Sequence, residues 1–75
     1  MATLTYRILL HEEPEGGFTV TVPSLPGCIT YGDNLNHAML MAREAIEGYI
    51  ELLRDQNEPV PDDSKTLEYS LTLAS

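Results

Sequence analysis

The chain has 75 residues, and its four basic and 12 acidic side chains give a net charge of −8. This charge repels phosphate groups, so the composition argues against direct binding to nucleic acid or to an anionic membrane, and it suits a basic protein partner. Alternatively, the negative charge has no partner and only keeps a small protein soluble. The single cysteine excludes an internal disulfide and fits a reducing cytoplasm, and the N-terminal residues do not resemble a signal peptide. We therefore predict a cytoplasmic, acidic protein.

The length predicts one domain over residues 1–75. A chain of this size buries only about 60 % of its unfolded surface on folding, so a one-sided core is marginal. We therefore expect self-association to supplement the fold.

Three segments in the first half of the chain have the alternating pattern of strands. Residues 3–12, 18–22 and 28–31 alternate or are rich in β-branched and aromatic residues. Glycines and prolines separate them at residues 13–17 and 23–27, which predicts a hairpin loop and a turn. The three segments predict an antiparallel meander.

A helix is expected to follow, with Asn34 or Asp33 as its N-cap, and to end near Asn57 because Pro59 restricts the residue before it. Apolar side chains fall on one continuous face at 100° per residue. They are Leu35, Ala38, Met39, Ala42, Ala45, Ile46, Tyr49, Ile50 and Leu53. This spacing predicts a helix that packs on one face of the sheet.

Residues 65–73 alternate again and predict a fourth strand. A strand reached through a helix normally lies parallel to its neighbour. The predicted fold class is therefore α+β, a single β-β-β-α-β domain with a mainly antiparallel sheet in the order 3-2-1-4. Its second face carries Thr3, Thr5, Thr19 and Thr21. This face is either exposed to solvent or shared between subunits, and we treat it as a candidate oligomer face.

Two acidic clusters are candidate partner-binding residues. The helix carries Glu44, Glu47 and Glu51 on its polar side, and Leu40 lies within the same polar arc as an apolar anchor. Glu12 and Glu13 form the second cluster, in the first hairpin. Both clusters also have a plain interpretation as solvated surface.

The sequence offers no convincing catalytic or metal-binding set, and we predict no enzyme, metal or cofactor. Cys28 has no adjacent base or cation to activate it and is expected to be structural. His11 and His37 lack a paired ligand spacing. A nuclease using Asp33 and Glu47 would need more carboxylates converging on the sheet. An enzyme or a small-ligand domain is kept as a third hypothesis.

The run GFTVTVPSLPGCITYGD (residues 17–33), the helix with Ala38, Ala42, Ala45 and Ile46, and the later EPVP (residues 58–61) resemble the N-terminal domain of HicB antitoxins. The resemblance covers about residues 4–61. It implies a β-β-β-α-β domain described as a partially degraded ribonuclease H-like fold, which agrees with the order of elements predicted above.

By this resemblance the protein would bind and neutralise a small basic HicA-type toxin. Such toxins are mRNA-cleaving ribonucleases of double-stranded-RNA-binding fold with a catalytic histidine. Many relatives add a C-terminal DNA-binding domain, which we do not expect here because no basic helix or ribbon follows residue 73. The alternative is a stand-alone homo-oligomeric structural or regulatory protein of the same fold with no toxin partner.

Overall fold

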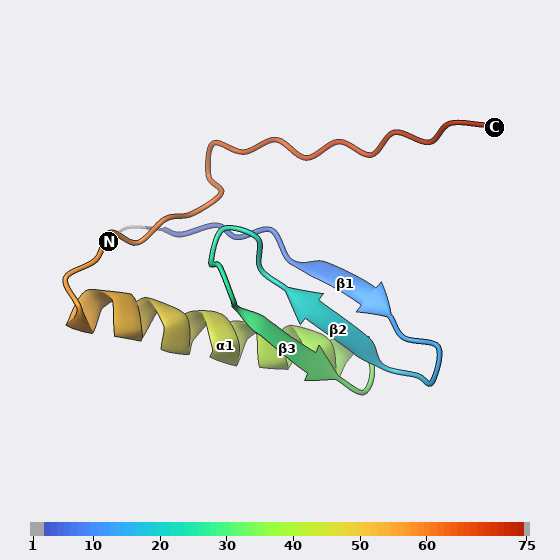
Figure 1. Cartoon of the computed structure of the whole chain (residues 1–75), viewed down its shortest axis with the longest axis horizontal. Coiled ribbons are helices and arrows are strands. Elements are labelled where there is room, and N and C mark those ends of the chain that lie inside the picture. Colours follow the sequence, from blue (N-terminus) through green and yellow to red (C-terminus); the bar gives the residue numbers. More distant parts are fainter. Residues whose placement is uncertain (1–2, 75) are drawn as a thin grey trace.

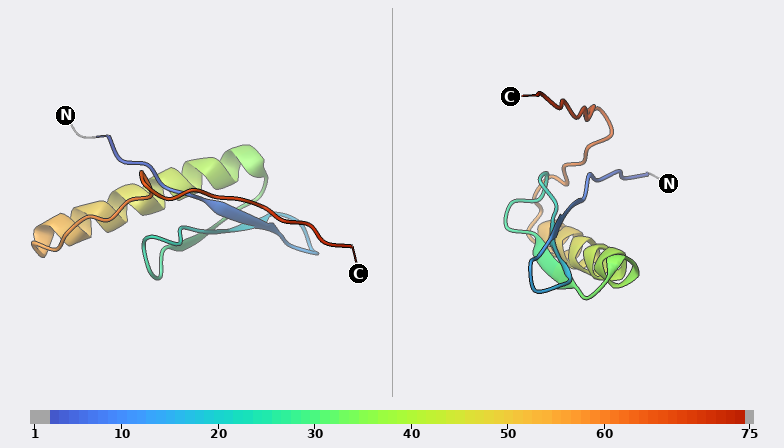
Figure 2. Two further views of the ribbon diagram at one scale, coloured as in Figure 1. Left: turned by 90° about the horizontal axis from the view of Figure 1, so that it is seen from above. Right: turned by 90° about the vertical axis from the view of Figure 1, so that its right-hand side faces the viewer.

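The computed structural model describes residues 3–74, in which three strands and one helix form an α+β fold (Figure 1). The strands are β1 (Leu9–Glu12), β2 (Phe18–Thr21) and β3 (Ile29–Gly32), and the helix is α1 (Leu35–Asp55). The sheet is antiparallel with the order β1-β2-β3. Helix α1 covers one face of the sheet (Figures 1 and 2). The predicted meander and its single covering helix are confirmed.

Strand β1 is shorter than the predicted strand over residues 3–12. In its pairing with β2, Leu9 lies opposite Thr21, so continuing the same register would place Arg7 opposite Pro23. Proline has no N–H to donate, and the chain turns there through hydrogen bonds from the Leu25 N–H to the Val22 carbonyl and from the Cys28 N–H to the Leu25 carbonyl. Residues 3–8 are therefore extended without being part of the sheet.

The ends of α1 follow the sequence signals. The Asn34 side chain accepts a hydrogen bond of 2.8 Å from the His37 N–H, so Asn34 rather than Asp33 is the N-cap. At the other end, Asn57 adopts a left-handed conformation with φ of 57°, two residues before Pro59. This reversal ends the helix where the sequence predicts it.

The core consists of two adjacent clusters between the sheet and α1. One contains Val20, Ala38 and Ala42, and the other is built on Val22, Leu25 and Cys28. The alanines allow a close approach of helix and sheet. A Cβ built on Gly32 would lie 2.3 Å from the Cα of Ala38, so β3 needs glycine at this position.

The predicted fourth strand is not formed, and the predicted sheet order 3-2-1-4 reduces to β1-β2-β3. Residues 66–74 are extended and exposed, and they run in the same direction as β1 but apart from it (Figures 1 and 2). A turn closed by a hydrogen bond of 2.9 Å from the Thr66 N–H to the Asp63 carbonyl precedes them. Alternating apolar and polar residues show that an extended segment would have two chemically distinct faces. A β-strand also needs a neighbouring strand with which its backbone can form hydrogen bonds.

Candidate partner-binding site

The four candidate residues on α1 lie in one exposed stripe. Leu40, Glu44, Glu47 and Glu51 are spaced by four, three and four residues, so they are neighbours along the surface of the helix. We call these four residues the acidic stripe. The three carboxylates are exposed, and Leu40 is 57 % exposed. The structure therefore brings together the helical half of the predicted site.

Arg43 partly offsets the charge of this stripe. Its Nε atom lies 3.6 Å from Oε2 of Glu47, and both side chains are largely exposed. Exposed ion pairs of this kind contribute little to stability. Within residues 3–74, Glu44 and Glu51 form no ion pair, so their charges are not offset as that of Glu47 is.

An open apolar groove of about 390 Å³ lies beside the stripe. Leu4, Tyr6 and Ile8 line one wall, from the extended segment before β1. The other wall comes from α1 and consists of Met39, Arg43, Ile46, Glu47 and Ile50. Leu4 and Met39 are 37 % and 45 % exposed, so the apolar surface here is only partly covered.

The hairpin acids do not join the stripe. The β1–β2 hairpin lies at the end of the sheet where α1 begins, whereas Glu51 belongs to the last turns of the helix, at the opposite end (Figure 1). Glu12 is exposed, but Glu13 is half-buried and accepts a hydrogen bond of 2.7 Å from the Thr19 hydroxyl. Glu13 therefore stabilises the β1–β2 hairpin through this hydrogen bond. The acidic cluster of the hairpin and the acidic stripe of the helix are separate surfaces.

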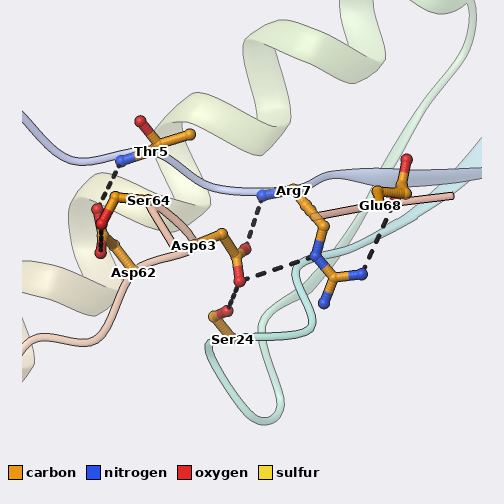
Figure 3. Close-up of polar contacts among 7 residues, drawn as sticks. All are labelled: Thr5, Arg7, Ser24, Asp62, Asp63, Ser64 and Glu68. Atoms are coloured by element: carbon orange, nitrogen blue, oxygen red, sulfur yellow. Dashed lines mark hydrogen bonds and ion pairs between the residues drawn. The ribbon is translucent and has the colours of Figure 1, made fainter. Parts of the chain in front are cut away.

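The candidate oligomer face is uneven. Thr3 and Thr5 are exposed, whereas Thr19 and Thr21 are half-buried. The linker after α1 crosses next to Thr5: the Thr5 N–H donates to the Asp62 carboxylate at 3.0 Å, and the Asp63 N–H donates to the Thr5 carbonyl at 2.7 Å (Figure 3).

The sequence did not identify Asp63 as a structural residue, because residues 58–63 predict only an extended connector. It is 4 % exposed, and its carboxylate accepts hydrogen bonds from the Arg7 N–H at 2.8 Å and from the Ser24 hydroxyl (Figure 3). These bonds, the one from Arg7 first, lower the pKa of Asp63 below the ordinary aspartate value. The Arg7 Nε lies 3.7 Å from the same carboxylate. Asp63 thus ties the linker to the first extended segment and to the turn before β3.

Asp62 strengthens the same attachment. Besides the Thr5 N–H, its carboxylate accepts a hydrogen bond of 3.0 Å from the Ser64 hydroxyl, and the two donors lower the pKa of Asp62. We call Asp62 and Asp63 together the linker anchor. Its two carboxylates occupy the backbone N–H groups of Thr5 and Arg7.

Two of the groups considered for catalysis, Cys28 and His37, make structural contacts. Cys28 is buried in the core, and burial raises the pKa of its thiol, which disfavours the nucleophilic thiolate. The Nδ1 atom of His37 accepts a hydrogen bond of 2.9 Å from the Asp33 N–H at the start of α1. Across residues 3–74, three or more His, Cys, Asp or Glu side chains do not gather in a way that could hold a metal ion. In the same part of the chain, no helix has the length and apolar character needed to cross a membrane.

The fold and its surfaces define a small acidic α+β domain with three antiparallel strands and one covering helix. Residues 6–73 match the family described as the HicB_like antitoxin of bacterial toxin-antitoxin systems. The chain belongs to the HicB-like antitoxin family. This match includes residues 65–73, whereas the motifs in the sequence resembled the family only over about residues 4–61.

Similar proteins fall into two groups by length. A UPF0150 protein of Thermoplasma acidophilum is 38 % identical over 61 residues, covering 81 % of this chain and 88 % of that protein. A UPF0150 protein of Synechocystis is 41 % identical over 58 residues, covering 77 % of this chain and 73 % of that protein. The protein named antitoxin HicB 1 of Photorhabdus laumondii is 33 % identical over 77 % of this chain, which spans only 37 % of that antitoxin. The chain thus corresponds to most of the UPF0150 proteins and to about a third of this HicB antitoxin.

Proposed function

We propose that the chain is an antitoxin that binds and neutralises a small, basic, mRNA-cleaving toxin of the HicA type. The observation that carries this proposal is the family match over residues 6–73. The printed names of the Photorhabdus and Escherichia coli relatives as HicB antitoxins support it. The same relationship favours a non-catalytic regulatory protein with a partially degraded ribonuclease H-like fold. A toxin that cleaves mRNA would place its action in the cytoplasm.

The proposed mechanism is steric and electrostatic occlusion. A toxin that cleaves mRNA needs a basic surface for the phosphate backbone. The acidic stripe offers such a surface a row of carboxylates at helical spacing, with Leu40 as an apolar contact beside them. The net charge of −8 adds long-range attraction that speeds encounter. Docking through the stripe would cover the toxin surface where RNA must lie.

The test uses the product of a neighbouring short basic open reading frame as the candidate toxin. Binding is measured by titration calorimetry, and neutralisation by RNA cleavage and by rescue of growth on co-expression. We expect tight binding that weakens as salt concentration rises. Absence of binding to any such product would remove the antitoxin proposal.

A charge-matched pair of variants locates the binding surface. Glu44→Gln with Glu51→Gln changes the net charge from −8 to −6 within the stripe. Glu15→Gln with Glu58→Gln makes the same change in net charge at exposed positions outside it. We expect the first pair to weaken toxin binding by about 10-fold or more and the second by much less, because close charge pairs across an interface are worth more than distant ones. Equal losses would show that net charge alone, and not the stripe, attracts the toxin.

A second candidate function is a homo-oligomeric structural or regulatory protein of the same fold without a toxin. The favouring observation is the exposure of Leu67, Tyr69, Leu71 and Leu73, from 77 % to 97 %, which leaves apolar surface in need of cover. A stable oligomer in sedimentation, together with no toxin encoded alongside, would support this candidate. Its candidate subunit face remains the one carrying Thr3, Thr5, Thr19 and Thr21.

A further inference from the structure

Residues 65–74, which we call the tail, have the chemistry of a strand without its sheet. Large apolar side chains alternate with polar ones along the tail. Their exposed fractions are 97 % for Leu67, 91 % for Tyr69, 77 % for Leu71 and 79 % for Leu73. Strict alternation is the pattern of a strand with one face buried and one face in water. The tail therefore has an apolar face that residues 3–74 of its own chain do not cover.

The same chain offers an edge strand beside an apolar groove. Within the described residues, strand β1 is at the edge of the sheet and pairs with β2 alone, so its outer backbone groups can accept another strand. Beside it lies the apolar groove between residues 4–8 and α1. A strand added along this edge with its apolar side chains toward α1 would cover Met39, Ile46 and Ile50. An edge strand and an apolar groove together are what strand addition requires.

The linker anchor directs the tail away from this surface in its own chain. The carboxylates of Asp62 and Asp63 already occupy the N–H groups of Thr5 and Arg7, where a following strand would begin to pair. Beyond the turn from Asp63 to Thr66 the tail runs apart from β1 (Figure 1), and the ion pair of 3.6 Å between Nη1 of Arg7 and Oε1 of Glu68 still links it to the first extended segment (Figure 3). The tail beyond the turn is exposed and is not part of the sheet of its own chain, so its backbone is accessible to a neighbouring molecule.

We propose that the tail is an exchanged strand that docks on a second copy of this chain. Residues 65–74 of each chain lie along the β1 edge and over the apolar groove of the other, so the two contacts are equivalent and close a two-fold dimer. Burying a large apolar side chain is worth about 1.5–3 kcal/mol at about 25 cal/mol per Å², which corresponds to about 60–120 Å², so the eight side chains of two tails bury on the order of 500–1,000 Å². With the groove and edge surfaces that they cover, the total reaches the size of specific, stable interfaces, which begin at about 1,200 Å². The proposal is independent of toxin binding.

The first test is sedimentation of the purified full-length chain without any toxin. We expect a dimer at micromolar concentration. Leu71→Asp with Leu73→Asp should weaken the dimer by at least about 100-fold, because two charges would enter an apolar interface. The matched control is Leu35→Asp with Leu52→Asp, two leucines of α1 that are 55 % and 54 % exposed and belong neither to the groove nor to the acidic stripe. This control should remain dimeric.

Circular dichroism checks that the tail variants fold, which we expect because both substituted side chains are exposed in the single chain. A monomeric wild-type chain at all concentrations would overturn the proposal. So would a dimer that the tail substitutions leave intact, since another face would then hold it together. Because no toxin is present, failure here is distinct from failure of the antitoxin proposal.

Cross-linking separates exchange from closure within one chain. In a Cys28→Ala background, a chain with Tyr69→Cys is mixed with a tagged chain carrying Met39→Cys, and both are oxidised. A disulfide between the two chains supports exchange. A single chain that carries both cysteines and closes only upon itself, as a monomer, would show that the tail covers its own groove and would refute exchange.

Discussion

Gly32 marks the closest approach of the sheet to α1, and it permits a sharp test of the packing. A Cβ at this position would lie 2.3 Å from both the N and Cα atoms of Ala38, and 2.7 Å from its Cβ. The first two are backbone atoms in the first turn of α1, so no side-chain rotation can relieve the clash. Gly32→Ala must therefore displace the helix from β3. Overpacking of this kind costs about 1–3 kcal/mol.

Gly48 supplies the matched control, because the same substitution there meets open space. A Cβ at Gly48 has nothing within 4 Å beyond its own helix backbone. Glycine in a helix interior is less favourable than alanine by about 0.5–1 kcal/mol. Gly48→Ala should therefore stabilise the chain, while Gly32→Ala destabilises it.

Urea unfolding followed by circular dichroism measures both changes, at one protein concentration since association would shift the transition. With a slope of about 1 kcal/mol per M for a small protein, Gly32→Ala should lower the midpoint by about 1 M or more. Gly48→Ala should raise it by up to about 1 M. A midpoint for Gly32→Ala equal to or above that of the wild type would refute the close contact between β3 and α1.

Three further variants test the core, the helix cap and the linker anchor by the same unfolding assay. Leu25→Ala, at a side chain with 0 % exposure, should lower the free energy of unfolding by about 2–5 kcal/mol, whereas Leu40→Ala should change it by less than about 0.5 kcal/mol; similar losses would contradict the core assignment. Asn34→Ala should cost about 1 kcal/mol because the His37 N–H loses its acceptor, and an unchanged midpoint would argue against this cap. The lowered pKa of Asp63 means that its contribution is complete above the ordinary aspartate pKa of about 3.9 and is lost as the pH falls through the lower folded-state value. Asp63→Asn should therefore flatten the acid side of the stability profile, and a profile identical to that of the wild type would exclude the anchor.

Local signals predicted much of the fold. The alternation of Val20 and Val22 with threonines placed both valines in the core, and the helical period placed Ala38 and Ala42 against the sheet. Asn34 was one of two predicted caps. These features depend on residues close in sequence, where the side-chain period and capping chemistry act directly.

The linker anchor could not be predicted in this way. Asp63 is buried because Arg7, 56 residues earlier, and Ser24, 39 residues earlier, donate to it. Nothing in the local sequence distinguishes it from an exposed acid in a connector. The prediction of a fourth strand over residues 65–73 was wrong for a related reason. The alternating pattern specified an apolar face but not which molecule would cover it. For the candidate site the helical period predicted only the placement of residues: the helical acids form one stripe, while Glu13 is held within its hairpin, and partner binding by these residues stays a prediction.

Helix α1 carries two adjacent surfaces that meet at Glu47. This residue belongs to the acidic stripe and also lines the apolar groove, where it pairs with Arg43. A substitution at Glu47 would therefore disturb toxin docking and tail docking together and could not separate them. Glu44 and Glu51 belong to the stripe alone, and Leu71 belongs to the tail alone. Loss of toxin binding in the first case and loss of the dimer in the second would each report on one surface, so the two proposals can fail independently although a single helix supports both.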